Sequence, residues 1–303
     1  MALGTDQVTI STAATFIPEI WSDEIVAAYK KNLVAANLFK KMSFAGKKGD
    51  TVHLPSPTRG SAAIKAANTQ VTLIAATEGD VAVSIDKHYE YSRLIEDIVE
   101  AQALSSLRRF YTDDAGYALA RQVDTSMIQL GRTFNGGSGV TYGGAYIGGD
   151  GTTAYTSGSS NASALTSAGI RRTVQRLDDA DVPMEGRFFL IPPSARNTLM
   201  GINEYTAQSF VGEVGGGNTI RNGEIGSLYG IPVFVSSNAD TATGGARIAL
   251  MGHKDAAVLV EQQGVRSQTQ YKQEYLGTLY TADTLYGVKE LRDGACIALA
   301  VPA

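Results

Sequence analysis

The side chains most suited to acid–base or metal chemistry are the three histidines, His53, His88 and His253. None has a second histidine within a few residues, so the helical two-histidine pattern of zinc enzymes is absent. A lone histidine in or beside a strand is more often structural or exposed than catalytic. The sequence therefore favours structural histidines and leaves a catalytic one as the alternative.

Two serine motifs come close to known nucleophile patterns. Gly136–Val140 approaches a nucleophile elbow, but it lacks the last glycine and the preceding apolar strand. Ser84 and Lys87 have the spacing found in penicillin-binding enzymes, yet the residues around them alternate like a strand and do not begin a helix. A serine hydrolase using Ser84 or Ser138 with one histidine is therefore only the weaker alternative.

The sequence predicts no catalytic, cofactor-binding or metal-binding residues and no cofactor. No glycine-rich loop has the pattern of a phosphate cradle or of a dinucleotide-binding turn. Asp178, Asp179 and Asp181 cluster, but Val182-Pro183 follows where a calcium loop needs glycine, which indicates a solvated helix end. Cys296 is the only cysteine, which excludes an internal disulfide and suits a reducing compartment. We expect a protein that is not an enzyme.

The composition is that of a folded protein with many loops. The chain has 303 residues, of which 44% are hydrophobic and 18% charged, and it contains 33 glycines. The net charge of −4 argues against a dedicated nucleic-acid binder, because such proteins are usually basic. No apolar run of about 18 residues occurs, so we expect neither a signal peptide nor a membrane span.

One stretch of the sequence, Leu104 to Leu130, stands out among the predicted secondary-structure elements. Its apolar residues recur at steps of three and four, which predicts a helix of roughly 40 Å. From this run alone a long supporting helix and an ordinary core helix are equally favoured. The opposite, charged face carries Arg108, Asp113, Asp114, Arg121, Asp124 and Arg132.

Before this helix, the pattern predicts an arm, a short helix and a long hairpin. Met1–Thr15 is small and polar, and a helix starting near Pro18 would place Trp21, Ile25, Ala28 and Tyr29 on one face. Two extended runs flank a tip of small residues between Gly49 and Tyr91, which predicts a protruding hairpin. Leu94–Ala103 is expected to be a lead-in helix.

After this helix, Asn135–Ser160 has the composition of a loop, and strands alternate with helices beyond it. We expect a serine to cap the second of these helices and Asp293-Gly294 to form the turn of a terminal hairpin. The predicted helices are 163–181 and 194–202, and the predicted strands are 187–191, 231–235, 247–251, 256–260, 288–292 and 295–301.

The order of several motifs resembles the major capsid proteins of tailed bacteriophages, which share the Johnson fold. Arg171–Pro193 resembles the family's helix that ends in an acidic Val-Pro turn before Gly-Arg and a strand. Asn222–Asn238 is similar to its glycine-rich segment before the next strand. Gly49–Val52 and Ala120–Asp124 are similar to the start of its extended loop and to its long helix.

The resemblance implies an α+β subunit that has the tailed-phage capsid fold. Its implied parts are an N-terminal arm with a short helix (1–48), an extended β-hairpin loop (49–91), a peripheral domain with the spine helix and a glycine-rich excursion (92–162), an axial α/β domain (163–246), and C-terminal strands that return to the peripheral domain (247–303).

The function implied by the resemblance is that of a major capsid protein whose copies form the icosahedral head around double-stranded DNA. The implied partners are further copies in pentamers and hexamers, a portal, separate scaffolding or cement proteins, and the packaged DNA through non-specific proximity, without a membrane. The protein would be assembled in the host bacterial cytoplasm and located in the virion. An encapsulin-type nanocompartment shell is the neighbouring alternative.

The resemblance also suggests which residues contact neighbouring subunits. Some members cross-link a lysine of the extended loop to an asparagine on a neighbour, and Lys65 lies in the corresponding loop. The charged face of the spine helix is the expected receiving surface. The candidate contact residues are Lys65, Asn68, Asp113, Asp114, Arg121 and Arg132.

Overall fold

The structure is a computed structural model that describes residues 34–57, 60–71, 73, 78–97, 106–135, 137, 147–156, 162–202, 226–242 and 244–303. The predicted arm and the helix beginning near Pro18 lie outside the described residues. The described chain starts with a short helix, α1 (Ala35–Leu38).

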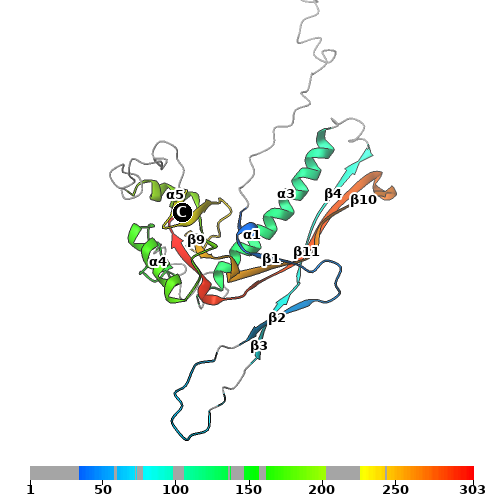
Figure 1. Cartoon of the computed structure of the whole chain (residues 1–303). Helices are drawn as coiled ribbons and strands as arrows, with labels where there is room; N and C mark the ends of the chain where they lie inside the picture. The colour runs from blue at the N-terminus through cyan, green and yellow to red at the C-terminus, as the bar shows by residue number, and fades with distance from the viewer. Residues whose placement is uncertain are drawn as a thin grey trace, which may run out of the picture.

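A four-stranded sheet and one long helix form an elongated half of the molecule (Figure 1). The strand order is β1 (Lys40–Ser43), β10 (Ala257–Lys272), β11 (Gly277–Glu290) and β4 (Lys87–Glu96). The helix, α3 (Ser106–Gln129), lies along β4 and β11 and continues into the 3-10 turn η2 (Leu130–Arg132). Its 24 residues span about 36 Å, which confirms the predicted long helix.

A six-stranded mixed sheet forms the second half of the molecule. Its strand order is β5 (Ile147–Gly148), β12 (Cys296–Val301), β9 (Arg247–His253), β6 (Arg187–Ile191), β8 (Ile231–Val235) and β7 (Ser227–Leu228). Two helices, α4 (Ser167–Asp179) and α5 (Pro193–Met200), cover one of its faces.

Side chains that alternate along β6 show why both faces of this sheet are buried. Phe189 and Ile191 pack with the apolar residues of α4 and α5. Phe188 and Leu190 point to the opposite face, where they join Met127 of α3 in the main core. Because successive strand residues face opposite sides, the continuous apolar run of β6 suits a strand covered twice.

The extended loop is a separate two-stranded hairpin that leaves the body of the molecule (Figure 1). Strands β2 (Thr51–Pro57) and β3 (Glu78–Ser84) pair in antiparallel register, with Thr51 opposite Ser84. The root of the hairpin is anchored to the body of the molecule, where Val83 and Ile85 pack against Val258 and Val260 of β10. The predicted protruding hairpin is confirmed between Thr51 and Ser84, whereas the last part of the predicted range, from Lys87 to Tyr91, belongs to β4 of the four-stranded sheet.

Three local predictions are wrong. β4 continues as a strand to Glu96, so the first part of Leu94–Ala103 is not a helix, because its backbone pairs with β11. Pro192 precedes α5 without a side-chain cap, and the Ser194 hydroxyl instead donates to the carbonyl oxygen of Pro302. Asp293-Gly294 lies in the 3-10 turn η5 (Asp293–Ala295) and joins no hairpin.

The strands near the C-terminus pair in two different sheets. β11 pairs with β4 and β10, whereas β12 pairs with β9 and β5 in the other sheet. β9 in turn pairs with β6, so the strands of 247–303 are divided between the two sheets. Every residue of β12 and nearly every residue of β9 is buried, as expected for strands inside a sheet that is covered on both faces.

Candidate assembly surfaces

Helix α3 is fixed to the four-stranded sheet by small and aromatic side chains. Ala115 and Leu119 are buried against Ala282 of β11, and further tyrosines of β4 and β11 surround them. Nearer its end, Met127 and Ile128 enter the main core. The apolar face predicted from the sequence is therefore the face that α3 buries, which leaves its other face for contacts outside the subunit.

Asp124 is fully buried, so its prediction as part of the charged outer face is wrong. Its Oδ1 accepts hydrogen bonds from the backbone N–H groups of Ala35 at 2.7 Å and Ala36 at 3.3 Å. Its Oδ2 accepts one from Nδ2 of Asn238 at 3.0 Å. Burial raises the pKa of Asp124, and these hydrogen bonds oppose the rise. Asp124 therefore joins α1, α3 and the segment after β8.

Arg132 makes a second connection to the segment after β8. Its Nε donates to Oδ2 of Asp240 at 2.8 Å and its second guanidinium nitrogen donates to Oδ1 at 2.9 Å. This bidentate pair is partly buried, with a quarter of the Arg132 side chain exposed. The guanidinium that the sequence suggested for a neighbouring subunit is thus bound within its own chain.

The other predicted residues of α3 lie toward solvent. Asp114 accepts a hydrogen bond from the Tyr91 hydroxyl at 3.1 Å, and the pKa of Tyr91 is raised, first by burial and then by this bond. Arg93 lies over the Tyr111 ring, 4.3 Å from its centroid. Asp113 and Arg121 are also exposed on this helix. Asp113, Asp114 and Arg121 therefore give α3 a charged outer surface.

Lys65 and Asn68 lie far from this surface in their own subunit, in an exposed turn of the extended loop. Asn68 has a left-handed φ of 59°, and the Thr69 hydroxyl closes the turn by donating to the carbonyl oxygen of Ala66 at 2.7 Å. Two apolar side chains in this loop are almost entirely exposed, Ile64 at 101% and Leu73 at 88%. Such exposure of large apolar side chains indicates a surface that another molecule covers.

A polar cluster stiffens the far half of the β10–β11 ribbon. Asp283 of β11 accepts a bidentate pair from Arg266 at 3.0 and 2.8 Å. Gln263 donates to the same carboxylate at 2.9 Å and His88 at 3.2 Å. The Arg266 hydrogen bonds lower the pKa of Asp283 to about 2, against the effect of burial. His88 thus has a structural role on this ribbon.

Sequence reasoning missed the exposed apolar residues at the end of this ribbon. Val265, Tyr271, Tyr275 and Leu276 are all more than 45% exposed. The Tyr271 hydroxyl donates to Asp97 at 2.7 Å. The sequence could have indicated this part of the strand, because Val265, Thr269 and Tyr271 favour β structure, lie at alternate positions and belong to a segment without proline.

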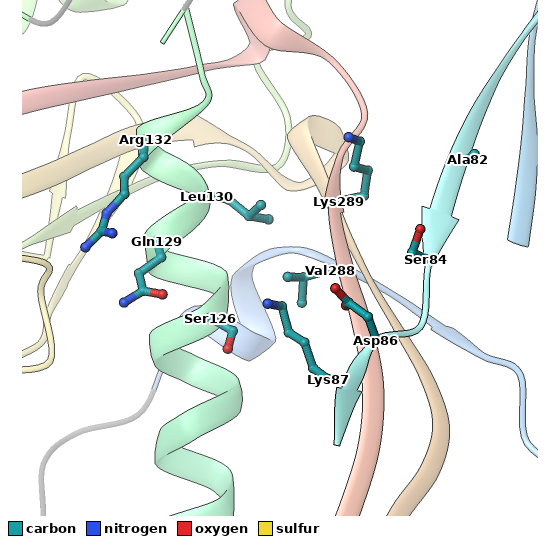
Figure 2. Close-up of a pocket in the computed structure, with 10 residues that line it drawn as sticks. All are labelled: Ala82, Ser84, Asp86, Lys87, Ser126, Gln129, Leu130, Arg132, Val288 and Lys289. Carbon is teal, nitrogen blue, oxygen red and sulfur yellow. The ribbon is translucent and has the colours of Figure 1, made fainter. Parts of the chain in front are cut away.

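A polar cavity of about 350 Å³ lies where the extended loop meets α3 and β11 (Figure 2). Ser84 and Lys87 both line it, together with Asp86 and Lys289. Among the described residues that line this cavity there is no histidine, so Ser84 has no histidine partner there of the kind that the predicted serine hydrolase needs. Ser138, the other predicted nucleophile, lies outside the described residues.

The three histidines are bound elsewhere. His53 pairs with Asp80 on the extended loop, and His88 with Asp283. His253 is buried, with Nε2 donating to the Glu185 carbonyl oxygen at 2.7 Å and Nδ1 accepting from the Asp255 N–H at 3.1 Å. Across the described residues none of them hydrogen-bonds to a serine, which speaks against a catalytic dyad.

Neither a metal cluster nor a membrane helix is found in the part of the chain that the structure describes. There, no three His, Cys, Asp or Glu side chains come together in a way that could hold a metal ion. No described helix is both long and apolar enough to cross a membrane.

A family model described as phage capsid protein matches residues 36–294, which is most of the chain. The chain belongs to the phage capsid protein family. It is a structural protein of the virion and not an enzyme, so the serine hydrolase alternative is wrong. No curated protein matches it.

Solved structures resemble the capsid protein over nearly its whole length. A structure from Mycobacterium phage Che8 has 25% identity and a TM-score of 0.75, and the match covers 94% of this chain and 97% of the other. The capsid of Cyanophage P-SCSP1u has 21% identity and a TM-score of 0.75, covering 99% and 96%. The mature capsid of bacteriophage PhiM1 has 13% identity and a TM-score of 0.69, covering 94% and 92%.

These matches confirm the predicted tailed-phage capsid fold, with α3 as its spine helix. They also confirm the predicted function. The capsid protein is the major capsid protein of an icosahedral head, and it associates with copies of itself.

Proposed function

We propose that the extended loop is the clamp by which one capsid protein holds the next in pentamers and hexamers. The observation that carries this proposal is the exposure of Ile64 and Leu73 on a hairpin that leaves its own subunit. Covering each side chain on a neighbour would contribute about 1.5–3 kcal/mol. Repeated at every subunit, this contribution would favour association between neighbouring copies.

The surface that receives the loop is the charged outer face of α3 on the neighbouring copy. Lys65 on the loop and Asp113 on α3 carry opposite charges, and Asn68 can hydrogen-bond to either charge of this face. Asp114 and Arg121 lie on the same face. Arg132 can contribute less to this surface, because its guanidinium is paired with Asp240 and only a quarter of its side chain is exposed. Charge reversal by Arg121→Glu lowers the assembled fraction under this proposal, while Arg292→Glu, a control at an exposed position after the end of β11, does not. Unchanged assembly of the Arg121 variant would remove this face from the interface.

The head formed by this protein encloses double-stranded DNA. The net charge of −4 supports an inner wall along which packed DNA slides without adhering. Free subunits should therefore not retard double-stranded DNA in a gel at physiological salt. Retardation would count against this role of the charge, and shells that hold an enzyme in place of DNA would favour an encapsulin-type compartment.

A portal and separate scaffolding or cement proteins complete the proposed set of partners. The resemblance to the tailed-phage capsid family is the observation that supports them. Co-purification of heads from infected cells would identify them by mass spectrometry.

The clamp is tested by placing charge on the loop tip. We expect the double variant Ile64→Asp and Leu73→Asp to stay in the unassembled fraction of a sedimentation gradient, because burying two carboxylates on a neighbour is unfavourable. The matched control, Ile64→Val with Leu73→Ile, keeps the apolar surface and should assemble. Shells of normal yield from the charged variant would show that the tip is not the clamp.

A further inference from the structure

An apolar groove of about 480 Å³ lies between the end of α1 and strands β6 and β8. Leu38 and Phe39 line it on the side of α1, and Phe188, Pro232 and Phe234 line it on the side of the strands. The rings of Phe39 and Phe188 are buried and meet edge to face, with 5.0 Å between their centroids. The core of the subunit therefore holds this groove open as a preformed recess.

The charged side chains around the groove leave its interior apolar. The Arg187 guanidinium is bound to Asp178 and to two backbone carbonyl groups. Lys40 and Lys254 are exposed at the rim, where their long stems can cover apolar surface while the ammonium groups stay in water. Asp255 is the one carboxylate among the described lining residues. Such a groove suits aliphatic side chains better than a polar ligand.

The extended loop carries two aliphatic side chains that match this groove. Val71 is 59% exposed and Leu73 is 88% exposed, on a loop that leaves the body of its own subunit (Figure 1). Residues two positions apart point to the same side of an extended segment, so both can enter one recess. Copies in a ring meet through two different surfaces, and a projection on one copy therefore needs a recess elsewhere on the same chain.

The groove lies within reach of a loop that contacts α3. The Asp124 carboxylate of α3 accepts hydrogen bonds from the start of α1, and Leu38 of the groove wall is at the end of that short helix. Asp113 lies about 17 Å from Asp124 along the helix axis. The chain from Asn68 to Leu73 spans at most about 17 Å. A loop whose turn meets α3 near Asp113 can thus place Leu73 at the groove.

We propose, resting on the clamp proposed above, that Val71 and Leu73 of one copy occupy this groove on the next copy. The groove supplies what the charged face of α3 lacks, a place where aliphatic side chains leave water. Lys65 and Asn68 then make the polar contacts with α3 that fix the direction of the loop.

Cross-linking in assembled shells of the full chain tests this contact. The variant Leu73→Cys with Pro232→Cys, treated with a flexible bifunctional maleimide, should give linked dimers and higher multimers on a denaturing gel. Pro232 is exposed in the subunit, and the native Cys296 is buried. In Pro232→Cys alone, assembly should slow labelling of the new thiol several-fold.

The control position is Gln175, which is exposed on α4. α4 packs with Phe189 on one face of the six-stranded sheet, whereas Phe188 of the groove belongs to the opposite face. Leu73→Cys with Gln175→Cys should therefore stay unlinked.

A second variant tests whether the groove matters for assembly. Pro232→Arg places a long charged side chain at the groove wall and should lower the assembled fraction several-fold, whereas Gln175→Arg should assemble normally. Circular dichroism of the unassembled subunits should show both variants folded, and the cross-link does not depend on either of them.

The outcomes separate this inference from the clamp on which it rests. Shells without the link between the Leu73 and Pro232 variants would overturn the inference, as would normal yield from Pro232→Arg. Protection of the Pro232→Cys thiol without that link would mean that another segment covers the groove. In each case the clamp still stands if the charged variant at Ile64 and Leu73 fails to assemble. Normal shells from that charged variant would remove both.

Discussion

The side-chain amide of Asn238 donates a hydrogen bond to the buried carboxylate of Asp124, 3.0 Å away, across 114 residues of sequence. The same carboxylate accepts the first N–H groups of α1, which have no partner within so short a helix. One side chain of the spine helix thus holds both the start of the described chain and the segment that links β8 to β9.

Replacing Asp124 by alanine should lower the free energy of unfolding by about 3 kcal/mol, because buried N–H groups of Ala35 and Ala36 would lose their acceptor. Urea denaturation of the subunit measures this. Asp113→Ala, on the exposed face of the same helix, is the control and should change stability little. If both substitutions lowered the free energy of unfolding equally, Asp124 would not be holding α1 and the segment after β8 in place.

The pair between Arg132 and Asp240 should behave as a single unit. Arg132→Ala is expected to cost about 1–3 kcal/mol, since the bidentate bonds are only partly exposed to solvent. The double variant Arg132→Asp with Asp240→Arg should recover part of this loss, whereas each charge reversal alone should be worse than alanine. A double variant as unstable as the sum of the two single reversals would show that the residues do not interact.

The pKa of Asp283 makes the β10–β11 ribbon sensitive to acid. The carboxyl pKa falls from 3.8 to about 2 on folding, so the native state binds the proton less tightly than the unfolded chain. The stabilisation is therefore complete above about pH 4 and is lost as the pH falls toward 2. The difference in urea midpoint between the unchanged protein and Asp283→Asn should be largest near neutral pH and should disappear near pH 2. A difference in urea midpoint that stays the same at every pH would contradict the lowered pKa of Asp283.

Cys296 should react with thiol reagents only when the protein unfolds, because burial raises the pKa of its thiol. A Cβ added at Gly252 would lie 2.6 Å from its Sγ, so Gly252→Ala should destabilise the subunit by about 1–3 kcal/mol and speed labelling. Gly264→Ala is the control, since no atom lies within 4 Å of its added Cβ. Fast labelling of the unchanged protein under native conditions would contradict the buried position.

The sequence alone predicted the helices and strands whose apolar residues follow a regular pattern. Residues such as Ala115, Leu119 and Met127 recur at helical spacing and are buried inside the subunit, so α3 could be recognised before its surroundings were known. The run from Phe188 to Ile191 is apolar throughout, as suits a strand that is covered on both faces. The order of motifs then indicated the family.

The failures come from residues whose partners lie far away in the sequence. Asp124 has the spacing of an exposed charge, and only the donors on Ala35, Ala36 and Asn238 make its burial favourable. Asp293-Gly294 is typical of a tight hairpin, but the strands on either side enter different sheets. Likewise the contacts of Arg132 could not be foreseen, since Asp240 is 108 residues away.

Electron microscopy of the purified capsid protein tests the central claim most directly. The account predicts closed icosahedral shells in which the extended loop of each copy crosses onto its neighbour. A protein that stays monomeric at every concentration, with the loop tip at Ile64 and Leu73 still exposed to solvent, would contradict it.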